Sequence, residues 1–393
     1  MTKCGVSASL ALLLSIAGCA NWRWSEGAPR EQLDPMTLEV EGDAEPETAV
    51  LTRSEDADLR LFGRDVRLED VAFQGQAATN LRQHTTPSEG ADFDPDIDPS
   101  GQLLVYGSTR HSNNSLLYLK SVNGATITQV TDGSADDTQP EFDPTGKRIA
   151  FSSNRSGHWD IWVVDIDGRN PIQVTASPMP ELHPSWSPDG KKLVYCRVNA
   201  KEGFSELWVA ELEKPGVKRL IGEGLFPAWS PKGDKIAYQR ARARGSRWFS
   251  IWTLDIDDNE VLFPTEVASS PDGALIAPCW SPDGERLAFS LVRSGEAASE
   301  PTPGATPATE TRVDIGVIDL DGRGFQRITN GRGRCYSPTW SRDGRVYFSA
   351  RLARSETIWS VRPFRPTRFD ESPSATTANN RRAAQIMDLE DEE

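Results

Sequence analysis

Short runs in which apolar residues dominate, each ended by a turn sequence, recur along the middle of the chain. Runs such as Lys192–Tyr195 and Arg286–Phe289 are typical of β-strands. Each is preceded by proline, Asp or Thr, and glycine, which are the residues that tight turns require. Tryptophan-containing runs such as Asp160–Asp165 follow and predict a further strand. The pattern therefore predicts an all-β protein built from hairpins.

The whole unit repeats. A phrase close to Pro-x-Trp-Ser-Pro-Asp-Gly-x-Lys/Arg-Leu-Ala-Tyr occurs six times, centred on Gly101, Gly146, Gly190, Gly233, Gly284 and Gly344. The shorter intervals are about 45 residues, which is the length of one four-stranded blade. Six such units that close on themselves predict a six-bladed β-propeller.

Each copy places a large apolar residue at the end of its first strand. These residues are Ile97, Phe142, Trp186, Trp229, Trp280 and Trp340. Large side chains there can fill the wedge between neighbouring blades, because aromatic residues bury the most apolar area. The fifth copy has Ile315-Gly316 where most others have an aromatic residue in the third strand, so we expect its sheet to be locally underpacked.

The last copy lacks a fourth strand of its own, because the chain continues into Pro363 and Pro366. A replacement precedes the first copy, at Ala78–Thr85, which is similar to the outer strand around Ile328. Pairing of this segment with the last blade would leave no open seam. We therefore expect a ring that is closed by strands from both ends of the chain.

The first residues are typical of a secretory signal: Lys3, then an apolar run from Val6 to Gly18 that is too short to span a membrane permanently. The run ends Leu-Ser-Ile-Ala-Gly-Cys19, which resembles the lipobox of bacterial lipoproteins. That resemblance implies that Cys19 becomes a lipid-modified amino terminus. An ordinary cleaved signal is the alternative. We expect attachment to the periplasmic side of the outer membrane.

The sequence divides into four regions: a lipoprotein signal peptide (1–18), an acidic tether (19–75), the propeller (76–365) and an acidic tail (366–393). The two flanks carry most of the net charge of −15 and have few aromatic residues, so we expect them to be disordered. The propeller itself is only mildly acidic, which makes nucleic acid an unsuitable partner. A Pro-rich insertion at 295–312 predicts a surface loop.

The sequence contains no nucleophile elbow, no HExxH motif and no phosphate-binding glycine loop. From these absences we predict a protein that is not an enzyme. Cys196, Cys279 and Cys335 remain after the signal and Cys19; Cys279 and Cys335 could pair, or all three could be free thiols. No Cys/His metal spacing occurs.

One set of candidate binding residues is acidic. Asp92, Asp137 and Glu181 each lie three residues before the proline of an inner strand, where loops converge on the axis. A half-ring of carboxylates could bind Ca²⁺ or a cationic group, with His183 facing the same channel. The alternative is that each carboxylate accepts hydrogen bonds from its own loop.

A second set is basic. An arginine follows the second strand of each copy, and the candidates for a binding role are Arg110, Arg155, Arg242 and Arg244. Such arginines could bind carboxylates of a partner or of peptidoglycan. Pairing with acidic residues on neighbouring strands of the same blade explains the regular spacing of these arginines equally well. The fourth copy is the exception, because its excess arginines have no obvious partners.

The Trp-Ser-Pro-Asp-Gly phrases at Trp186 and Trp280, and the Phe-Ser-Ser-Asn-Arg sequence that ends at Arg155, resemble the WD40-like repeat of the TolB family. The resemblance covers residues 78–364 and implies a periplasmic propeller that binds envelope proteins. TolB has an α/β domain before its propeller, whereas here we expect about 55 weakly structured residues before the ring and a lipidated amino terminus. The resemblance is therefore to a TolB-like propeller lipoprotein, and not to TolB itself.

Together these features predict a monomeric, lipid-anchored, non-enzymatic propeller that binds an envelope protein or peptide on its channel face. The competing hypothesis is a carbohydrate-active or metal-assisted enzyme that uses Asp92, Asp137, Glu181 and His183 around the axis.

Overall fold

The computed structural model describes residues 60–61, 64–65, 78–87, 89–199, 203–241, 249–257, 260–261, 263–271, 273–293, 311–329, 333–352 and 355–364. These residues form strands, turns and irregular segments, and none of them lies in a helix. Two short strands, β1 (Arg60–Leu61) and β2 (Arg64–Asp65), pair only with each other. The predicted all-β class is confirmed for the described part of the chain.

The first three repeats each form one antiparallel sheet whose strands follow chain order. The first sheet contains β4 (Asp92–Ile97), β5 (Leu103–Ser108), β6 (Leu116–Ser121) and β7 (Ile127–Gln129). The second contains β8 (Asp137–Phe142), β9 (Arg148–Ser153), β10 (Asp160–Asp165) and β11 (Ile172–Gln173). The third contains β12 (Glu181–Trp186), β13 (Lys192–Asn199), β14 (Phe204–Glu211) and β15 (Lys218–Glu223).

The remaining repeats vary this plan. The next sheet contains β16 (Leu225–Trp229), β17 (Lys235–Ala241), β18 (Phe249–Asp257), β19 (Glu260–Val261) and β20 (Thr265–Ala268). Then come β21 (Gly273–Trp280), β22 (Arg286–Arg293), β23 (Arg312–Asp319) and β24 (Gln326–Arg327). The last group is β25 (Arg334–Trp340), β26 (Val346–Leu352), β27 (Ser355–Pro363) and β3 (Ala78–Gln83). A single parallel pair, Val313 with Arg334, joins these last two groups.

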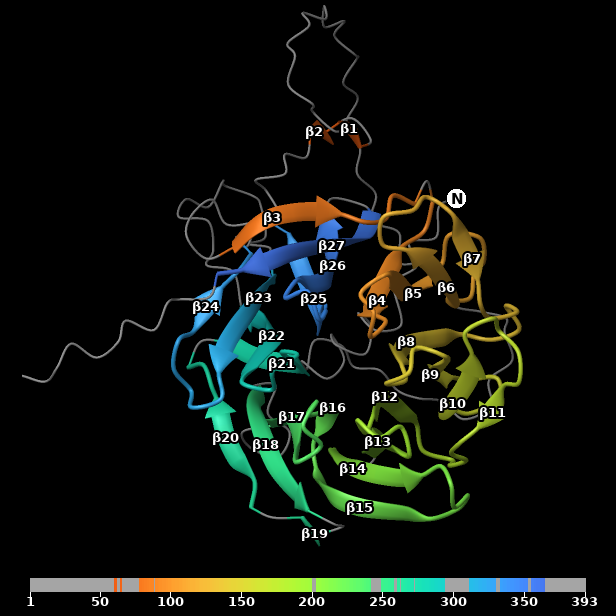
Figure 1. Cartoon of the computed structure of the whole chain (residues 1–393), viewed down its shortest axis with the longest axis vertical. Helices are drawn as coiled ribbons and strands as arrows, with labels where there is room; N and C mark the ends of the chain where they lie inside the picture. Colours follow the sequence, from red (N-terminus) through yellow and green to blue (C-terminus); the bar gives the residue numbers. More distant parts are fainter. Residues whose placement is uncertain are drawn as a thin grey trace, which may run out of the picture. The chain divides into compact units, whose positions relative to one another are not determined.

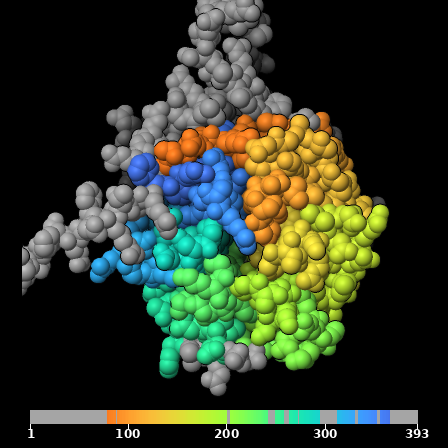
Figure 2. All heavy atoms as spheres, in the orientation of Figure 1, coloured from red at the N-terminus to blue at the C-terminus, as the bar shows by residue number. Residues whose placement is uncertain are grey.

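The first strand of each group lies nearest the centre, and we call β4, β8, β12, β16, β21 and β25 the inner strands. Each inner strand contacts the next in chain order, and β25 contacts β4. Figure 1 shows the groups arranged in this order about a common centre, and Figure 2 shows them packed side by side on one face. This arrangement is a β-propeller. Each group of strands is named below by its inner strand.

The predicted turn chemistry is present at the end of each inner strand. Gly146 has a φ of 70° and donates its N–H to the carbonyl of Asp143, while the Asp143 carboxylate accepts the N–H of Lys147. A φ in this range favours glycine, because a Cβ atom would clash with the backbone. The turn therefore directs the chain back into the second strand, β9.

The predicted wedge residues are buried between sheets. Phe142 packs with Val105 and Leu117 of the β4 sheet, and Trp186 packs with Ala150 and Ile161 of the β8 sheet. The Trp186 indole also donates to the carbonyl of Glu141 in the preceding sheet. Both side chains therefore bury apolar area, and the Trp186 indole adds a directional hydrogen bond between the two sheets.

The expectation of poor packing at Gly316 is wrong. A Cβ atom at this position would lie 2.8 Å from the ring of Phe325 and 3.0 Å from the ring of Phe289. The two rings stack with centroids 6.2 Å apart. The space left by the missing side chain is filled by aromatic rings from β22 and from the segment before β24.

The segment predicted as a replacement strand pairs with β27. β3 runs antiparallel to β27, with Gln83 opposite Trp359 and Thr79 opposite Arg362. The His84 N–H donates to the carbonyl of Ile358, and the His84 ring lies 2.7 Å from the Ser360 hydroxyl. In Figure 1 the orange β3 lies beside the blue β27. Strands from distant parts of the sequence therefore share one sheet.

Candidate functional site

Every inner strand carries a β-bulge at a residue that precedes proline. The residues at this position share a positive φ of about 50°, although none is glycine: Asp94, Gln139, His183, Phe226, Ala277 and Ser337. The register of each inner strand shifts at this point relative to its neighbour. The proline that follows has no N–H to donate to a ladder, so a bulge accommodates it well.

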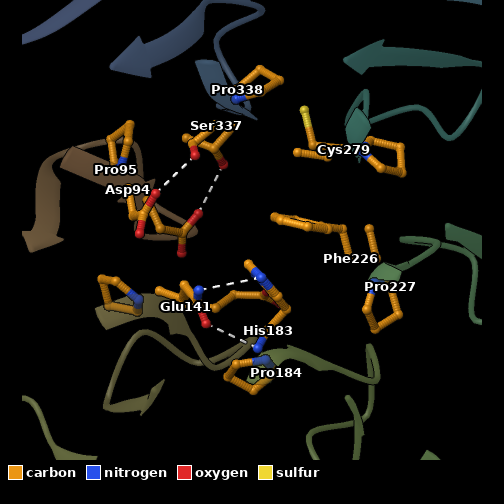
Figure 3. Close-up of a pocket in the computed structure, with 17 residues that line it drawn as sticks. Asp94, Pro95, Glu141, His183, Pro184, Phe226, Pro227, Cys279, Ser337 and Pro338 are labelled. Atoms are coloured by element: carbon orange, nitrogen blue, oxygen red, sulfur yellow. Dashed lines mark hydrogen bonds between the residues drawn. The ribbon is translucent and has the colours of Figure 1, made fainter. Parts of the chain in front are cut away.

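The bulges of all the inner strands line one central pocket with a volume of about 140 Å³. Each strand contributes the bulge residue, its proline and, with the exception of β12, the residue after the proline. In Figure 3 the prolines surround the opening and the bulge residues converge toward its centre. Because proline has a fixed φ, the pocket wall is rigid before any ligand arrives.

One side of the pocket is polar. Ser337 donates to Asp94 at 2.8 Å, and the Gln139 side-chain nitrogen lies 3.2 Å from His183 Nε2. These contacts join neighbouring sheets, as the dashed lines in Figure 3 show. Gln139 Oε1 also accepts the N–H of His183. The bulge residues are therefore held by side chains of the adjacent sheet.

Asp96 and Glu141, the residues after the prolines, reach across to the next sheet. The Asp96 carboxylate accepts from the Phe142 N–H at 2.8 Å and from the Thr339 hydroxyl at 2.9 Å. Glu141 accepts from the Ser185 hydroxyl and from the Trp186 N–H. The Ser185 hydroxyl in turn accepts the Trp229 N–H. We call this series the inter-sheet relay.

Burial is the main cause of the pKa shifts of the ionisable groups that line the pocket. It raises the pKa of Asp96 to about 6, and burial together with the charge of Asp96 raises the pKa of Glu141 to about 8. Burial also lowers the pKa of His183 to about 3. At neutral pH the polar side therefore presents a neutral imidazole and a protonated Glu141.

The opposite side of the pocket is apolar. Phe226 packs against the His183 ring with centroids 3.6 Å apart, and Figure 3 shows its ring between His183 and Cys279. Ala228 and Ala277 complete this side. Burial raises the pKa of the Cys279 thiol, which is therefore a neutral, weakly polar group. The pocket is amphipathic, with its two halves on different sheets.

The three acidic candidates lie elsewhere, each in a buried ion pair with an arginine of its own sheet. Asp92 lies 2.6 Å from Arg110, and Asp137 lies 2.9 Å from Arg155. Glu181 pairs in the same way with Arg197, at 2.7 Å. The side chains of all three acids are fully buried. Two of the predicted basic candidates, Arg110 and Arg155, are therefore the partners of two predicted acids.

The arginines of these pairs also cover aromatic rings. The guanidinium of Arg110 lies 5.5 Å from the Tyr106 centroid, and that of Arg155 lies 5.1 Å from the Trp162 centroid. Of the four residues predicted to surround the axis, His183 lines the pocket, and the three acids do not. Arg242 and Arg244 lie outside the described residues, as do the signal peptide, Cys19, the tail and most of the insertion.

The sequence contained a signal for the pocket, although residue type alone did not reveal it. The inner-strand proline recurs in every repeat, and the pocket is formed by that proline and its two neighbours. Those neighbours vary from Asp to Phe to Ala, so they carry no common chemistry. Asp94, Asp96, Gln139, Glu141 and Phe226 could have been found by comparing the positions that flank this proline.

No group of three or more His, Cys, Asp or Glu side chains among the described residues could hold a metal ion. Calcium binding stays a prediction that metal analysis of the purified protein would test. Cys196, Cys279 and Cys335 are free thiols. In the part of the chain that is described, no helix has the length and apolarity needed to span a membrane.

Residues 70–202 match the family model of the TolB β-propeller domain. An uncharacterized protein of Agrobacterium fabrum is 28% identical over 102 residues; the match covers 26% of this chain and 34% of that protein, about a third of its length. A solved structure of a TolB candidate from Agrobacterium tumefaciens has a TM-score of 0.51 and 21% identity, covering 74% of this chain and all of that one.

The fold is also that of an enzyme. A gluconolactonase of Xanthomonas campestris has a TM-score of 0.52 and 14% identity, covering 76% of this chain and 92% of that chain. The prediction that the chain is not an enzyme, which was drawn from missing motifs, is therefore wrong as an inference, because another protein of this fold is an enzyme. The predicted resemblance to the TolB family is confirmed: residues 70–202 match the family's β-propeller domain, and the described strands form a β-propeller.

Proposed function

We propose that this protein is a cell-envelope propeller that binds a protein or peptide by inserting one of its side chains into the central pocket. The observation that carries the proposal is the amphipathic pocket lined by every inner strand. Its volume of about 140 Å³ is close to that of a cavity that accepts one aromatic ring, and well below that of sites for drug-sized ligands. One side chain of a larger partner fits this size.

The pocket suits a side chain with an apolar body and a polar end. Phe226, Ala228 and Ala277 offer apolar contact, and Asp94, Gln139 and His183 offer hydrogen-bonding groups on the other side. The rigid proline wall reduces the entropy that binding would otherwise cost. Tyrosine, tryptophan and lysine are the side chains that match this description.

The proposal includes the architecture of the ring. Six blades, closed where β3 pairs with β27, would give the pocket a continuous wall and no free sheet edge. The contacts between successive inner strands, and between β25 and β4, support this count. The propeller of residues 76–365 would be flanked by the tether and the tail predicted from composition.

The proposal also includes the anchor. Lipid on Cys19 would hold the propeller on the periplasmic side of the outer membrane, with residues 19–75 as the tether. Replacing Cys19 with serine tests this part alone. The variant should move from the membrane fraction to the soluble periplasmic fraction, and an unchanged membrane fraction would refute the anchor without affecting the pocket.

Site-specific photo-crosslinking tests the binding function. A benzoylphenylalanine in place of Phe226 should capture one defined envelope protein in cells, and the same residue in place of Phe263, which is 86% exposed outside the pocket, should not. The purified partner should bind the Phe226→Ala variant roughly tenfold more weakly. Equal capture at both positions, or unchanged affinity of the variant, would contradict the proposal.

A further inference from the structure

The β12 sheet shows how this fold holds a partly buried arginine. Arg197 lies 2.7 Å from the Glu181 carboxylate and 3.9 Å from the Glu206 carboxylate. Its guanidinium covers the ring of Trp208, 4.2 Å from the centroid. The Trp208 indole donates to Glu206 at 2.8 Å. Two carboxylates and one aromatic ring therefore surround this cation.

The next sheet repeats this arrangement without the carboxylates. Arg240 lies opposite Ser250 in the ladder, as Arg197 lies opposite Glu206. Its guanidinium lies 5.3 Å from the centroid of Trp252, whose indole donates to the Ser250 hydroxyl at 2.9 Å. Serine thus replaces Glu206. Gly224, three residues before the inner-strand proline, replaces Glu181.

The chain cannot restore the first carboxylate at its own position. A Cβ atom on Gly224 would lie 2.4 Å from the Tyr238 ring and 3.0 Å from the carbonyl of Gln239. No side chain fits there without displacing core atoms. Within the described part of the chain, Arg240 has no carboxylate within ion-pair distance. The segment 242–248 contains three further arginines and no acidic residue in its sequence.

Arg240 and Trp252 are both partly exposed, so a ligand can reach them from solvent. A half-buried guanidinium with an aromatic ring on one face and no counter-ion binds an anion more strongly than a solvated one. The equivalent place in the β12 sheet is occupied by the carboxylate of a glutamate side chain. The arrangement around Arg197 therefore indicates that a carboxylate is the group that Arg240 would bind.

We propose that Arg240 and Trp252 form a carboxylate-binding site, which takes an aspartate or glutamate side chain of an acidic peptide. This inference rests on the proposed function only for the claim that the carboxylate belongs to a peptide partner. The site itself depends on neither the central pocket nor the lipid anchor. It adds a second contact and a charge requirement to the partner.

The site is tested through the indole N–H of Trp252, observed by NMR in ¹⁵N-tryptophan-labelled protein and assigned with Trp252→Phe. The probe is the α-amide of N-acetylglutamate, whose only charge is the side-chain carboxylate. Its addition should shift the Trp252 resonance in a saturable way. In Arg240→Gln the apparent affinity should fall roughly tenfold or more. The remaining indole resonances report whether each variant is folded.

Ser250→Glu provides the matched control. A glutamate at this position should reproduce the arrangement of Glu206 and occupy Arg240 from within the chain, so the probe should no longer shift Trp252. A saturable shift that persists in Ser250→Glu, or that keeps the parent affinity in Arg240→Gln, would overturn the proposal. So would the absence of a shift in the parent protein, or an equal response to inorganic phosphate at the same concentration.

The two proposals fail separately. Phe226→Ala should leave the response of Trp252 to the probe unchanged, since Phe226 belongs to the central pocket. If crosslinking at Phe226 finds no partner while the probe still binds, the peptide function falls and the carboxylate site remains. If the partner binds but Arg240→Gln changes neither the probe response nor partner affinity, the carboxylate site falls and the peptide function remains.

Discussion

The bulge residues of the inner strands occupy a conformation that side chains normally avoid. A left-handed backbone costs a residue other than glycine about 1–2 kcal/mol. Here it is retained in every inner strand because the following proline and the side chains of the adjacent sheet restrict the alternatives. Strain of this kind concentrates at binding sites, where it fixes the direction of a side chain.

Ala277 gives a direct measure of this strain, because its φ is 51° and its side chain is a single methyl group. Ala277→Gly should leave the free energy of unfolding unchanged or raise it by up to about 1 kcal/mol. Ala288→Gly, in the regular part of the adjacent strand β22, should lower it by about 1 kcal/mol. Urea denaturation compares the two, and equal losses would show that the bulge is unstrained.

The buried ion pairs should be sensitive to loss of one partner. Arg155→Ala leaves the carboxylate of Asp137 buried without its cation, and should lower the free energy of unfolding by about 3 kcal/mol. Arg169→Ala removes a pair whose side chains are 81% and 54% exposed, and should change it by less than about 0.5 kcal/mol. Similar values for the two variants in urea denaturation would contradict this difference.

At the scale of elements, β3 is the strand whose position depends most on tertiary contacts. Its residues alternate only weakly between buried and exposed, and its one long contact is with β27, which lies near the other end of the chain. Leu81 and Ala78 pack into the core of the β25 sheet. The pairing is therefore held by a few apolar side chains and the backbone ladder.

A disulfide can test this pairing in solution. Thr79→Cys with Arg362→Cys places two exposed cysteines at facing positions of β3 and β27. The bond should form under mild oxidation and raise the unfolding midpoint, because it closes a very long loop. Peptide mapping identifies the linkage, and the reduced double variant is the control. A linkage that fails to form, or forms only between molecules, would contradict the pairing.

The strands and turns were predictable because their determinants are local. Gly146 and Gly190 have positive φ values where the turn phrase requires glycine, and the tryptophans that follow the inner-strand prolines are buried as their size demands. The pocket was not predictable in this way. Asp94, Phe226 and Ala277 occupy equivalent positions but share no chemistry, and only folding brings them together. The packing of Phe325 over Gly316 likewise depends on a residue outside the strand that contains Gly316.

At the scale of the whole molecule, the inter-sheet relay links stability to pH. Burial and the charge of Asp96 raise the pKa of Glu141 from 4.5 to about 8, so the folded protein holds a proton that the unfolded chain releases in this range. The contribution of Glu141 to the free energy of unfolding is therefore fully present below about pH 4.5, and it is lost as the pH rises toward 8.

Glu141→Gln keeps the acceptor for Ser185 and Trp186 but cannot ionise. The free energy of unfolding of the variant should fall less steeply than that of the parent between pH 5 and pH 8. One group can contribute up to about 1.4 kcal/mol per pH unit to this slope. Thermal unfolding at several pH values measures the slope. Glu213→Gln, at a site 66% exposed, is the control and should keep the parent slope. Identical slopes for all three proteins would refute the role of Glu141.

The relay does not continue between the β21 and β25 sheets. At this joint Cys279 takes the place of Asp96 and Glu141, and the buried indole N–H of Trp340 has no acceptor, whereas the indole of Trp280 donates to the carbonyl of Ala228. Among the described residues, the contacts between the two sheets are apolar packing, the Val313–Arg334 bridge and the guanidinium of Arg286, which lies 4.8 Å from the centroid of Trp340. Local unfolding of the propeller should therefore begin at the contact between these two sheets. In native-state hydrogen exchange, the amides of β25 would lose their protection before those of β12.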